Sequence, residues 1–410
     1  MKKDFAGKRV LMLVENSSYP EDGRIYHEAT TLAEAGYQVS VICQSRPNRP
    51  WREVREGVYI FRYPYLISGK GLLSYIWEYS YSLIAMFALS IVALLKPGFD
   101  YIHAANPPDT AVFIAAFYKI LGKRFIFDHH DLSPEVYQVK YGANKKNSSL
   151  VYKILLTLEK LSCMFADRVI ATNQSYKAIE IERDGVSADR ITVVRNGPDT
   201  DRVHPVQPDP ELSGRAKTIF AYLGSMAKQD GVDHLLRALY NLDQRFGYHD
   251  WFCVLIGPAD DMPGLQRLAR ELSLADRTWF TGYLPLERWL PLISAVDICV
   301  EPAPALPLNE ASTMGKLMAY MALVKPTVAY DLREHRVTTG DAALYANPND
   351  EVDLASQFVK LIDNPDLRIK LGEMGRQRVV DLYDWKYQKD PLLSVYKSLA
   401  HKEQGVSHSE

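Results

Sequence analysis

The chain has 410 residues, well above the roughly 150 residues of a typical domain, so we expect two domains, each with its own core. Hydrophobic residues make up 47% and charged residues 24%, which excludes a disordered, collagen-like or coiled-coil chain. Because Lys and Arg number 48 and Asp and Glu number 50, no global positive field attracts nucleic acid, and we expect no nucleic-acid partner.

The four cysteines, Cys43, Cys163, Cys253 and Cys299, are too scattered for a CxxC pair or for zinc-ligand spacing. We interpret them as buried, reduced thiols, which favours a reducing compartment. Residues 1–8 are polar and lead directly into a strand pattern, so we expect no signal peptide. These features together predict a cytoplasmic protein.

In the first half of the chain, short apolar runs that favour strands alternate with runs that favour helices. The predicted strands are residues 9–14, 38–43, 58–63, 100–104, 124–128, 168–171 and 191–194. The predicted helices are residues 23–35, 72–95, 110–121, 150–165 and 174–183. Near-continuous apolar strands separated by helices indicate a parallel sheet that is covered on both faces.

Residues 196–214 are rich in proline and poor in apolar residues, which is typical of a linker. The alternation restarts beyond it, with predicted strands at residues 218–223, 251–256, 279–281, 297–300, 327–330 and 343–345. Helices are expected from residue 231, at 265–272 and, near the C-terminus, at 351–363, 365–382 and 385–400. The pattern predicts an α/β fold of two doubly wound, Rossmann-like domains.

Residues 72–95 form the most apolar stretch and hold one charge, Glu78. A membrane-spanning helix needs ~20 predominantly apolar residues, whereas the uninterrupted apolar part here, residues 83–95, is about two-thirds of that length. We therefore favour a helix buried in its domain, with one face at a membrane interface, over a true span. An aromatic cluster would suit that interface and would equally suit an acceptor groove: Tyr75, Trp77, Tyr79 and Tyr81.

Ligands of a doubly wound sheet bind at the carboxyl ends of the strands, so each strand-to-helix junction is a candidate site. The first junction, residues 15–24, contains Gly23 as its single glycine and lacks a GxGxxG motif. This argues against a dinucleotide-binding oxidoreductase.

Two further junctions carry polar residues, AANPPDT after His103 and DHHDLSPE at residues 128–135. Histidines and carboxylates could ligate a metal or perform acid/base chemistry. Because adjacent histidines on a loop point apart, we expect no metal site. We favour hydrogen bonding to a substrate, with structural capping as the alternative.

Two stretches of the second half are candidates for phosphate binding. YLGSMAKQDGVD, residues 222–233, combines a strand, a glycine turn and a helix start, whose amides could receive a phosphate, although any tight turn uses glycine. In the second stretch, residues 301–331, we expect Ser312 and Thr313 to cap a helix. A lysine in the first turn of a helix opposes the dipole unless an anion also lies there, so Lys316 is a diphosphate-ligand candidate, with a solvated surface lysine as the alternative.

The order of elements, the linker and six fragments resemble a retaining glycosyltransferase of family 4: DHHDLSPE, RVIATN, VRNGPD, LGSMAKQDGVD, STMGKLMAYMALVKP and DLREHR. The resemblance covers nearly the whole chain. It implies the GT-B architecture, in which two Rossmann-like domains face each other across a cleft. Residues 1–200 would then bind the acceptor and residues 201–384 the nucleotide-sugar donor, while a C-terminal helix at 385–401 returns to the first domain.

The resemblance also implies roles for individual residues. The donor-binding candidates are Gly224, Ser225, Lys228, Tyr283, Glu310, Ser312, Thr313, Lys316 and Ala319, with Tyr283 near the base. The acceptor-side candidates are Gly23, Asn106, Asp109 and Glu135. The catalytic candidates are His103, His130, Asp131 and Lys316. No metal or cofactor is implied, because the nucleoside-diphosphate sugar, for which we favour a UDP-sugar, is a substrate.

The sequence departs from the family pattern in both donor motifs. Ser225 and Asp230 stand where family members commonly carry Arg and Lys. Ala319 stands where a glutamate is expected, and Glu310 is one residue out of register with the other family glutamate. The missing contact to the donor ribose could weaken donor binding by ~1.5–3 kcal/mol, roughly ten- to a hundredfold.

We therefore expect a glycosyltransferase that moves a sugar to a hydroxyl group with retention, in the assembly of a cell-surface polysaccharide or glycolipid. The expected acceptor is lipid-linked or a glycan, with peripheral membrane contact through residues 72–95. The alternative, which Ala319 motivates, is a catalytically weak or inactive GT-B protein that binds a nucleotide or glycan and partners an active transferase.

Overall fold

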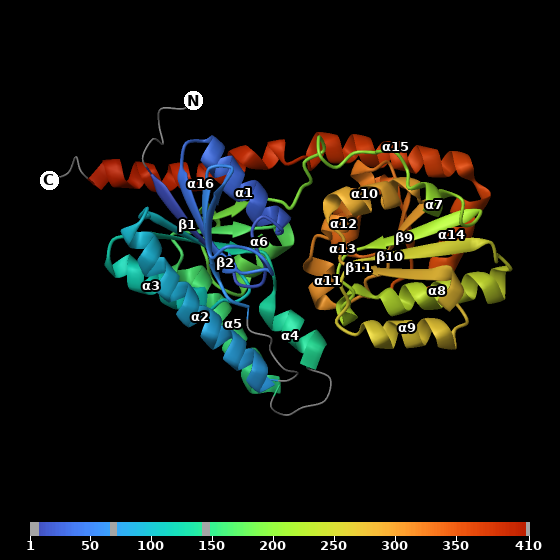
Figure 1. Ribbon diagram of the computed structural model, residues 1–410, viewed down its shortest axis with the longest axis horizontal. Helices are drawn as coiled ribbons and strands as arrows, with labels where there is room; N and C mark the ends of the chain where they lie inside the picture. Colours follow the sequence, from blue (N-terminus) through green and yellow to red (C-terminus); the bar gives the residue numbers. More distant parts are fainter. Residues whose placement is uncertain (1–7, 66–71, 142–147, 407–410) are drawn as a thin grey trace. The chain divides into compact units, whose positions relative to one another are not determined.

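The computed structural model describes residues 8–65, 72–141 and 148–406, with no description of the side chains of residues 72–76, 148–149 and 401–406. The polar segment 1–7 and the side chain of Tyr75 therefore lie outside the described residues. The chain forms two compact units (Figure 1). Unit 1 consists of Met1–Arg195 and Gln388–Glu410, and unit 2 of Asn196–Tyr387.

Within its described residues, unit 1 is built on an eight-stranded sheet of order β3-β4-β2-β1-β5-β6-β7-β8. Its strands are β1 (Arg9–Leu13), β2 (Gln38–Gln44), β3 (Arg52–Arg55), β4 (Val58–Tyr63), β5 (Tyr101–Ala105), β6 (Arg124–His129), β7 (Arg168–Ala171) and β8 (Ile191–Val193). All pairings are parallel except β3 with β4. The chain reverses its direction of winding between β1 and β5, which makes their carboxyl ends the switch point of this sheet.

The helices of unit 1 cover both faces of this sheet (Figure 1). They are α1 (Gly23–Glu34), α2 (Leu72–Leu95), α3 (Ala111–Ile120), α4 (Ser133–Tyr141), α5 (Ser148–Phe165), α6 (Gln174–Glu182) and the last helix, α16 (Lys386–Val406). Tyr396 of α16 is fully buried, and its ring centroid lies 5.3 Å from that of Tyr37 and 5.5 Å from that of Tyr101. Tyr396 of α16 is thus part of the core of unit 1.

Unit 2 is built on a parallel sheet of order β11-β10-β9-β12-β13-β14. Its strands are β9 (Thr218–Leu223), β10 (Trp251–Ile256), β11 (Thr278–Gly282), β12 (Ile298–Glu301), β13 (Thr327–Tyr330) and β14 (Ala343–Ala346). Its helices are α7 (Pro210–Ser213), α8 (Val232–Phe246), α9 (Met262–Glu271), α10 (Leu286–Ala295), α11 (Pro307–Ala311), α12 (Gly315–Ala322), α13 (Arg333–Thr339), α14 (Glu351–Asp363) and α15 (Pro365–Leu382). The winding reverses between β9 and β12, so their carboxyl ends form the second switch point.

These two sheets confirm the predicted pair of doubly wound, Rossmann-like domains. The prediction succeeded because strands covered by helices on both faces need apolar residues throughout: all six residues of β10 and all five of β5 are buried. The four cysteines are buried and free, as expected.

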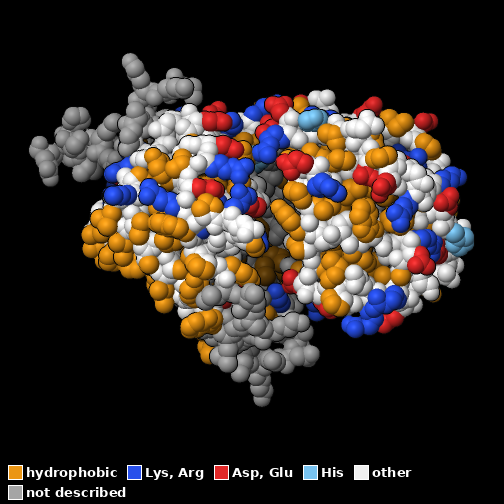
Figure 2. Space-filling model, in the orientation of Figure 1, with side chains coloured by type: hydrophobic (Ala, Val, Ile, Leu, Met, Phe, Trp, Pro, Cys, Tyr) orange, Lys and Arg blue, Asp and Glu red, His pale blue; other side chains and the backbone are white. Residues whose placement is uncertain are grey.

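Helix α2 packs one face against its domain and leaves the opposite face exposed. Its buried residues recur at helical spacing, Ser82, Met86, Ser90 and Ala93, and its exposed apolar residues lie opposite them, Trp77, Ile84, Ile91, Val92 and Leu95. Of the described helices, α2 is the one long and apolar enough to cross a membrane. Within its apolar segment, Trp77–Leu95, 22% is buried. Figure 2 shows hydrophobic side chains gathered over α2 and α3. One face of α2 therefore packs against unit 1, and the opposite face leaves apolar side chains exposed.

Candidate functional site

Polar side chains gather at strand carboxyl ends in each unit. In unit 1, Asn106 follows β5 and binds the loop that follows β6. Its Oδ1 accepts hydrogen bonds from the backbone N–H groups of His130 (2.8 Å) and Asp131 (3.1 Å). Its Nδ2 donates to the carbonyl of Asp131 (2.6 Å) and to Asp109 Oδ1 (3.2 Å). Asn106 thus brings the acceptor-side candidate Asp109 together with the catalytic candidates His130 and Asp131.

Beneath these loops lies a buried network of charged residues centred on Arg24 of α1. Its guanidinium donates to both carboxylate oxygens of Asp128 (2.8 and 2.6 Å) and lies 3.1 Å from Glu28. His103 of β5 lies between Glu28 (3.3 Å) and Tyr396, whose hydroxyl is 2.7 Å from its Nδ1. Because His103 is fully buried, its position favours a structural role, in which it joins Glu28 to Tyr396, over contact with a substrate.

Three of these groups, Glu28, His103 and Asp128, lie close enough for one metal ion. The Arg24 guanidinium already contacts both carboxylates and supplies the positive charge that a metal would bring. It holds the pKa of Asp128 well below its usual range against the opposing effect of burial. The donor set therefore fits an ion-pair network better than a metal centre.

His130 and Asp131 lie at the outer edge of this network. The Nδ1 of His130 is 3.4 Å from Asp128 Oδ2, and the side chain is 10% exposed. Burial alone would lower the pKa of His130, but Asp128 raises it. Burial raises the pKa of Asp131 and brings that of Asp109 to about 6. A carboxyl pKa raised toward neutrality, like that of Asp109, is typical of groups that exchange protons.

Glu135, in the first turn of α4, belongs to a second ion-pair network. Its Oε1 accepts from Arg183 (2.5 Å), which also contacts the fully buried Glu159 (2.5 Å). Glu159 and Glu180 flank His129. Burial alone would lower the pKa of His129, but these two carboxylates raise it well above its usual value. Glu135 is thus fixed by Arg183 beside the acceptor-side loop.

In unit 2, Lys316 of α12 reaches the switch point between β9 and β12. Its Nζ donates to the hydroxyl of Tyr222 at the end of β9 (2.8 Å). The same atom lies 3.1 Å from Oε2 of Glu301, the last residue of β12, and 3.3 Å from Oδ1 of Asp230. Burial alone would lower the pKa of Lys316, but Glu301, Tyr222 and Asp230 raise it well above its usual range. The lysine is therefore a cation between two carboxylates.

The glycine turn after β9 lies directly against this lysine. Gly224 has φ 141°, and a Cβ there would lie 3.1 Å from Cε of Lys316. A side chain at this position would be strained and would crowd the lysine, so glycine is required here. Asp230 closes the same loop by accepting a hydrogen bond from the N–H of Ala227 (3.0 Å).

Three other donor-side candidates are more exposed than Lys316. Ser225 and Lys228 are exposed in the loop after β9, and Tyr283 is exposed after β11. Ala319 follows Lys316 by three residues on α12. Gly23 is the first residue of α1, in unit 1, and a Cβ there would meet no described atom within 4 Å.

The predicted helix cap at Ser312 and Thr313 is wrong. Helix α12 begins at Gly315 with Met314 as its N-cap, and no side chain caps it. The hydroxyl of Thr313 instead donates to Glu334 (3.0 Å), and Ser312 ends the preceding helix α11. Glu310 accepts from the N–H of Arg333 (2.9 Å), so it supports α13.

Two family profiles match most of the chain. That of Glycosyltransferase Family 4 matches residues 24–202, and that of Glycosyl transferases group 1 matches residues 217–364. The chain belongs to glycosyltransferase family 4. Unit 1 holds nearly all of the first matched segment, and the second lies wholly within unit 2.

Known proteins are similar to this family 4 chain over much of its length. The alpha-maltose-1-phosphate synthase of Mycolicibacterium smegmatis is 27% identical, covering 61% of this chain and 67% of its own. The phosphatidylinositol N-acetylglucosaminyltransferase GPI3 subunit of Saccharomyces cerevisiae is 21% identical, covering 93% and 81%. The solved structure of Anabaena HepE in complex with UDP and glucose has a TM-score of 0.72 at 15% identity, covering 95% and 100%, which shows the same GT-B fold.

Several residues of these networks were not predicted from the sequence: Arg24, Glu28, Tyr222, Glu301 and Tyr396. A signal existed for the first two, because Arg24 and Glu28 are spaced i, i+4 at the start of a predicted helix. No such signal exists for Glu301, whose partner Lys316 lies on a separate element.

Proposed function

We propose that this glycosyltransferase transfers a sugar from a nucleoside-diphosphate sugar, favouring a UDP-sugar, to a hydroxyl group with retention at the anomeric carbon. The observation that carries the proposal is the cationic Lys316 beside the Gly224 turn, at the switch point of unit 2. HepE, which shares the fold, binds UDP and glucose, and this supports a uridine donor.

In the proposed reaction, departure of the nucleoside diphosphate leaves an oxocarbenium-like centre, so stabilising the leaving phosphates is the main task. Lys316 and the backbone amides around Gly224 would meet that charge. On the acceptor side, His130 and Asp131 have pKa values raised by Asp128 and by burial, respectively, and would take up the proton of the attacking hydroxyl. We assign no metal or cofactor to the reaction.

We further propose a lipid-linked acceptor, met at the cytoplasmic face of a membrane in polysaccharide or glycolipid assembly. Exposed apolar residues on three contacting helices support this, including Ile84 on α2, Phe117 on α3 and Leu150 on α5. Lys96 and Lys153 are exposed on the same helices or directly after them and suit anionic headgroups. The yeast relative is named for phosphatidylinositol, which is itself a lipid.

The test of the proposed function is nucleotide binding followed by transfer. Thermal unfolding is measured with UDP, GDP, dTDP and CMP, alone and as sugar conjugates. A ligand at a hundred times its Kd stabilises by ~2.7 kcal/mol, which moves the midpoint by a few degrees. We expect a shift with uridine nucleotides, and NMR of the product should show the donor's anomeric configuration. The absence of a shift with every nucleotide contradicts the proposal.

A second candidate function is a catalytically weak or inactive protein that binds a nucleotide or glycan beside an active transferase. The buried Glu301 and the partly exposed Asp230 flank Lys316, so the three groups carry a formal charge of −1 where a diphosphate would bind. Ala319 also favours this second function, because its side chain cannot accept a hydrogen bond from the ribose of a donor. Nucleotide binding without turnover on any sugar conjugate would favour this function.

A further inference from the structure

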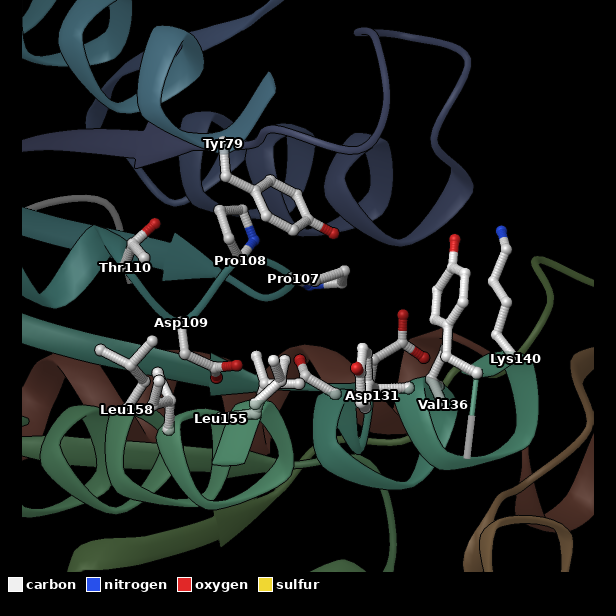
Figure 3. A pocket seen from close by; sticks show the side chains of 15 residues that line it. Tyr79, Pro107, Pro108, Asp109, Thr110, Asp131, Val136, Lys140, Leu155 and Leu158 are labelled. Carbon is white, nitrogen blue, oxygen red and sulfur yellow. The ribbon is translucent and has the colours of Figure 1, made fainter. Parts of the chain in front are cut away.

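Unit 1 contains a cavity of about 350 Å³ that neither ion-pair network fills. One wall is formed by Tyr79 of α2 with Pro107 and Pro108, the opposite wall by α5 with α4 (Figure 3). The volume lies at the lower end of the ~300–1,000 Å³ typical of small-molecule pockets. The cavity is therefore large enough for a segment of a ligand.

The surface of this cavity is almost wholly apolar. Val151, Ile154, Leu155 and Leu158 line it from α5, at the spacing of a single helical face, and Val136 adds to them from α4. Predominantly apolar pockets with a few polar groups are typical of small-molecule sites. This wall therefore favours a hydrocarbon occupant.

The polar groups of the cavity are confined to a few positions. Asp109 and Asp131, which Asn106 holds together, line it beside the acceptor-side loops, and Lys140 lies toward one end with Asp131 (Figure 3). The pKa of Asp109 is raised to about 6 by burial. An occupant that suits both regions has an apolar body and a hydroxyl-bearing head.

The cavity is continuous with the exposed apolar surface of the unit. Ile154 lines the cavity and is also 49% exposed on α5, one turn after the exposed Leu150. A hydrocarbon chain that leaves a membrane at this surface would reach the cavity along apolar side chains.

We propose that this cavity binds the aliphatic chain of the acceptor and so places the head group beside Asp109 and Asp131. This inference rests on the proposed transferase function and names the class of its acceptor, an amphiphile with a linear chain. The aliphatic chain of the acceptor, and not its head group alone, then determines which hydroxyl-bearing molecules bind.

The test uses n-alkyl β-glucosides with four to eight carbons as probes, on the full chain and without any donor. Binding is measured by thermal unfolding and titration calorimetry. Each added methylene should strengthen binding about fourfold until the cavity is filled, after which the affinity levels off. Affinity that is independent of chain length would overturn the proposal.

Two variants fill the cavity, and a third serves as the matched control. Leu155→Trp and the half-exposed Ile154→Trp place an indole in the cavity, and Met164→Trp makes the same change at an exposed position of α5 that does not line it. The first two should lose the dependence on chain length and the third should keep it. Equal effects of Ile154→Trp and Met164→Trp would also overturn the proposal.

The same samples separate this inference from the function on which it rests. UDP binding is measured beside the glucoside series. Glucoside binding that follows chain length in a protein without UDP binding would refute the transferase function and leave the cavity assignment standing. UDP binding with no response to chain length would refute the cavity assignment alone.

Discussion

The Nζ atom of Lys316 lies 3.1 Å from Oε2 of Glu301, a carboxylate with no exposed surface. A buried ion pair of this kind is weak as a source of stability, but removing one partner leaves an uncompensated charge. Glu301 thus fixes the position of the lysine and at the same time reduces the charge that it can offer to an anion.

Replacing Lys316 by Met should abolish the thermal shift with UDP and reduce transfer at least tenfold, because the cation nearest the glycine turn is removed. Without nucleotide, the variant should also unfold at a lower temperature, since Glu301 loses its partner. The control is Lys217→Ala, an exposed lysine at the opposite end of β9. Normal UDP binding by the Met variant would remove Lys316 from the phosphate site.

Asp230→Asn should tighten UDP-sugar binding several-fold, because it removes a negative charge 3.3 Å from Nζ of Lys316. Burial raises the pKa of Asp230 despite Lys316, so protonation should have the same effect in the unmodified protein. Affinity for UDP-glucose should therefore rise in the native chain as pH falls toward the raised pKa of Asp230, and stay constant in the variant. Titration calorimetry over a series of falling pH values measures this, and parallel pH profiles would refute it.

Glu15 follows β1 and should make unit 1 less stable at high pH. It accepts hydrogen bonds from Ser82 (2.8 Å) and Gln44 (3.1 Å), yet burial raises its pKa to about 7. The folded state then holds a proton that the unfolded state releases above its ordinary pKa, 4.5. This contribution is therefore largest below pH 4.5 and is lost as pH rises toward 7. Glu15→Gln should gain stability at pH 8 relative to pH 5, as measured by urea unfolding.

Asn106→Ala should destabilise unit 1 by about 2 kcal/mol or more, because the amide makes four hydrogen bonds, three of which join the loop after β5 to the loop after β6. Asn241→Ala is the control, since that amide bonds one carbonyl of its own helix. Hydrogen exchange of the His130 and Asp131 amides should accelerate in the first variant alone. Unchanged exchange would show that Asn106 does not hold these loops.

The exposed face of α2 should determine membrane binding. Ile84 and Ile91 are 70% and 42% exposed, and replacing both by Ser should reduce flotation with anionic vesicles at least tenfold. The matched control is the double Ser variant of Val337 and Ile369, two exposed apolar residues of unit 2. Equal flotation of both variants would contradict a membrane surface at α2.

The sequence predicts the sheets well because β9, β10 and their counterparts are apolar runs bounded by turns, a local pattern. It also places Lys316 in the first turn of a helix, as the structure shows, whereas its role as a phosphate ligand stays a prediction. It cannot supply Asp230 as a partner of Lys316, because the two lie 86 residues apart and meet only through the order of strands. Nor can it divide α2 into a packed and an exposed face, since the packed face holds Ser82 and Ser90 and the exposed face is the more apolar of the two.

The burial of Tyr396 has a consequence for how the chain folds during synthesis. Tyr37, Tyr101 and His103 obtain this partner from a helix that follows the whole of unit 2 in the chain. Unit 2 is complete in the chain before that helix is, so unit 2 can reach its final packing first. Unit 1, most of which precedes unit 2 in the chain, then closes its core after unit 2, and a chain that ends before α16 leaves three buried aromatic and imidazole rings uncovered.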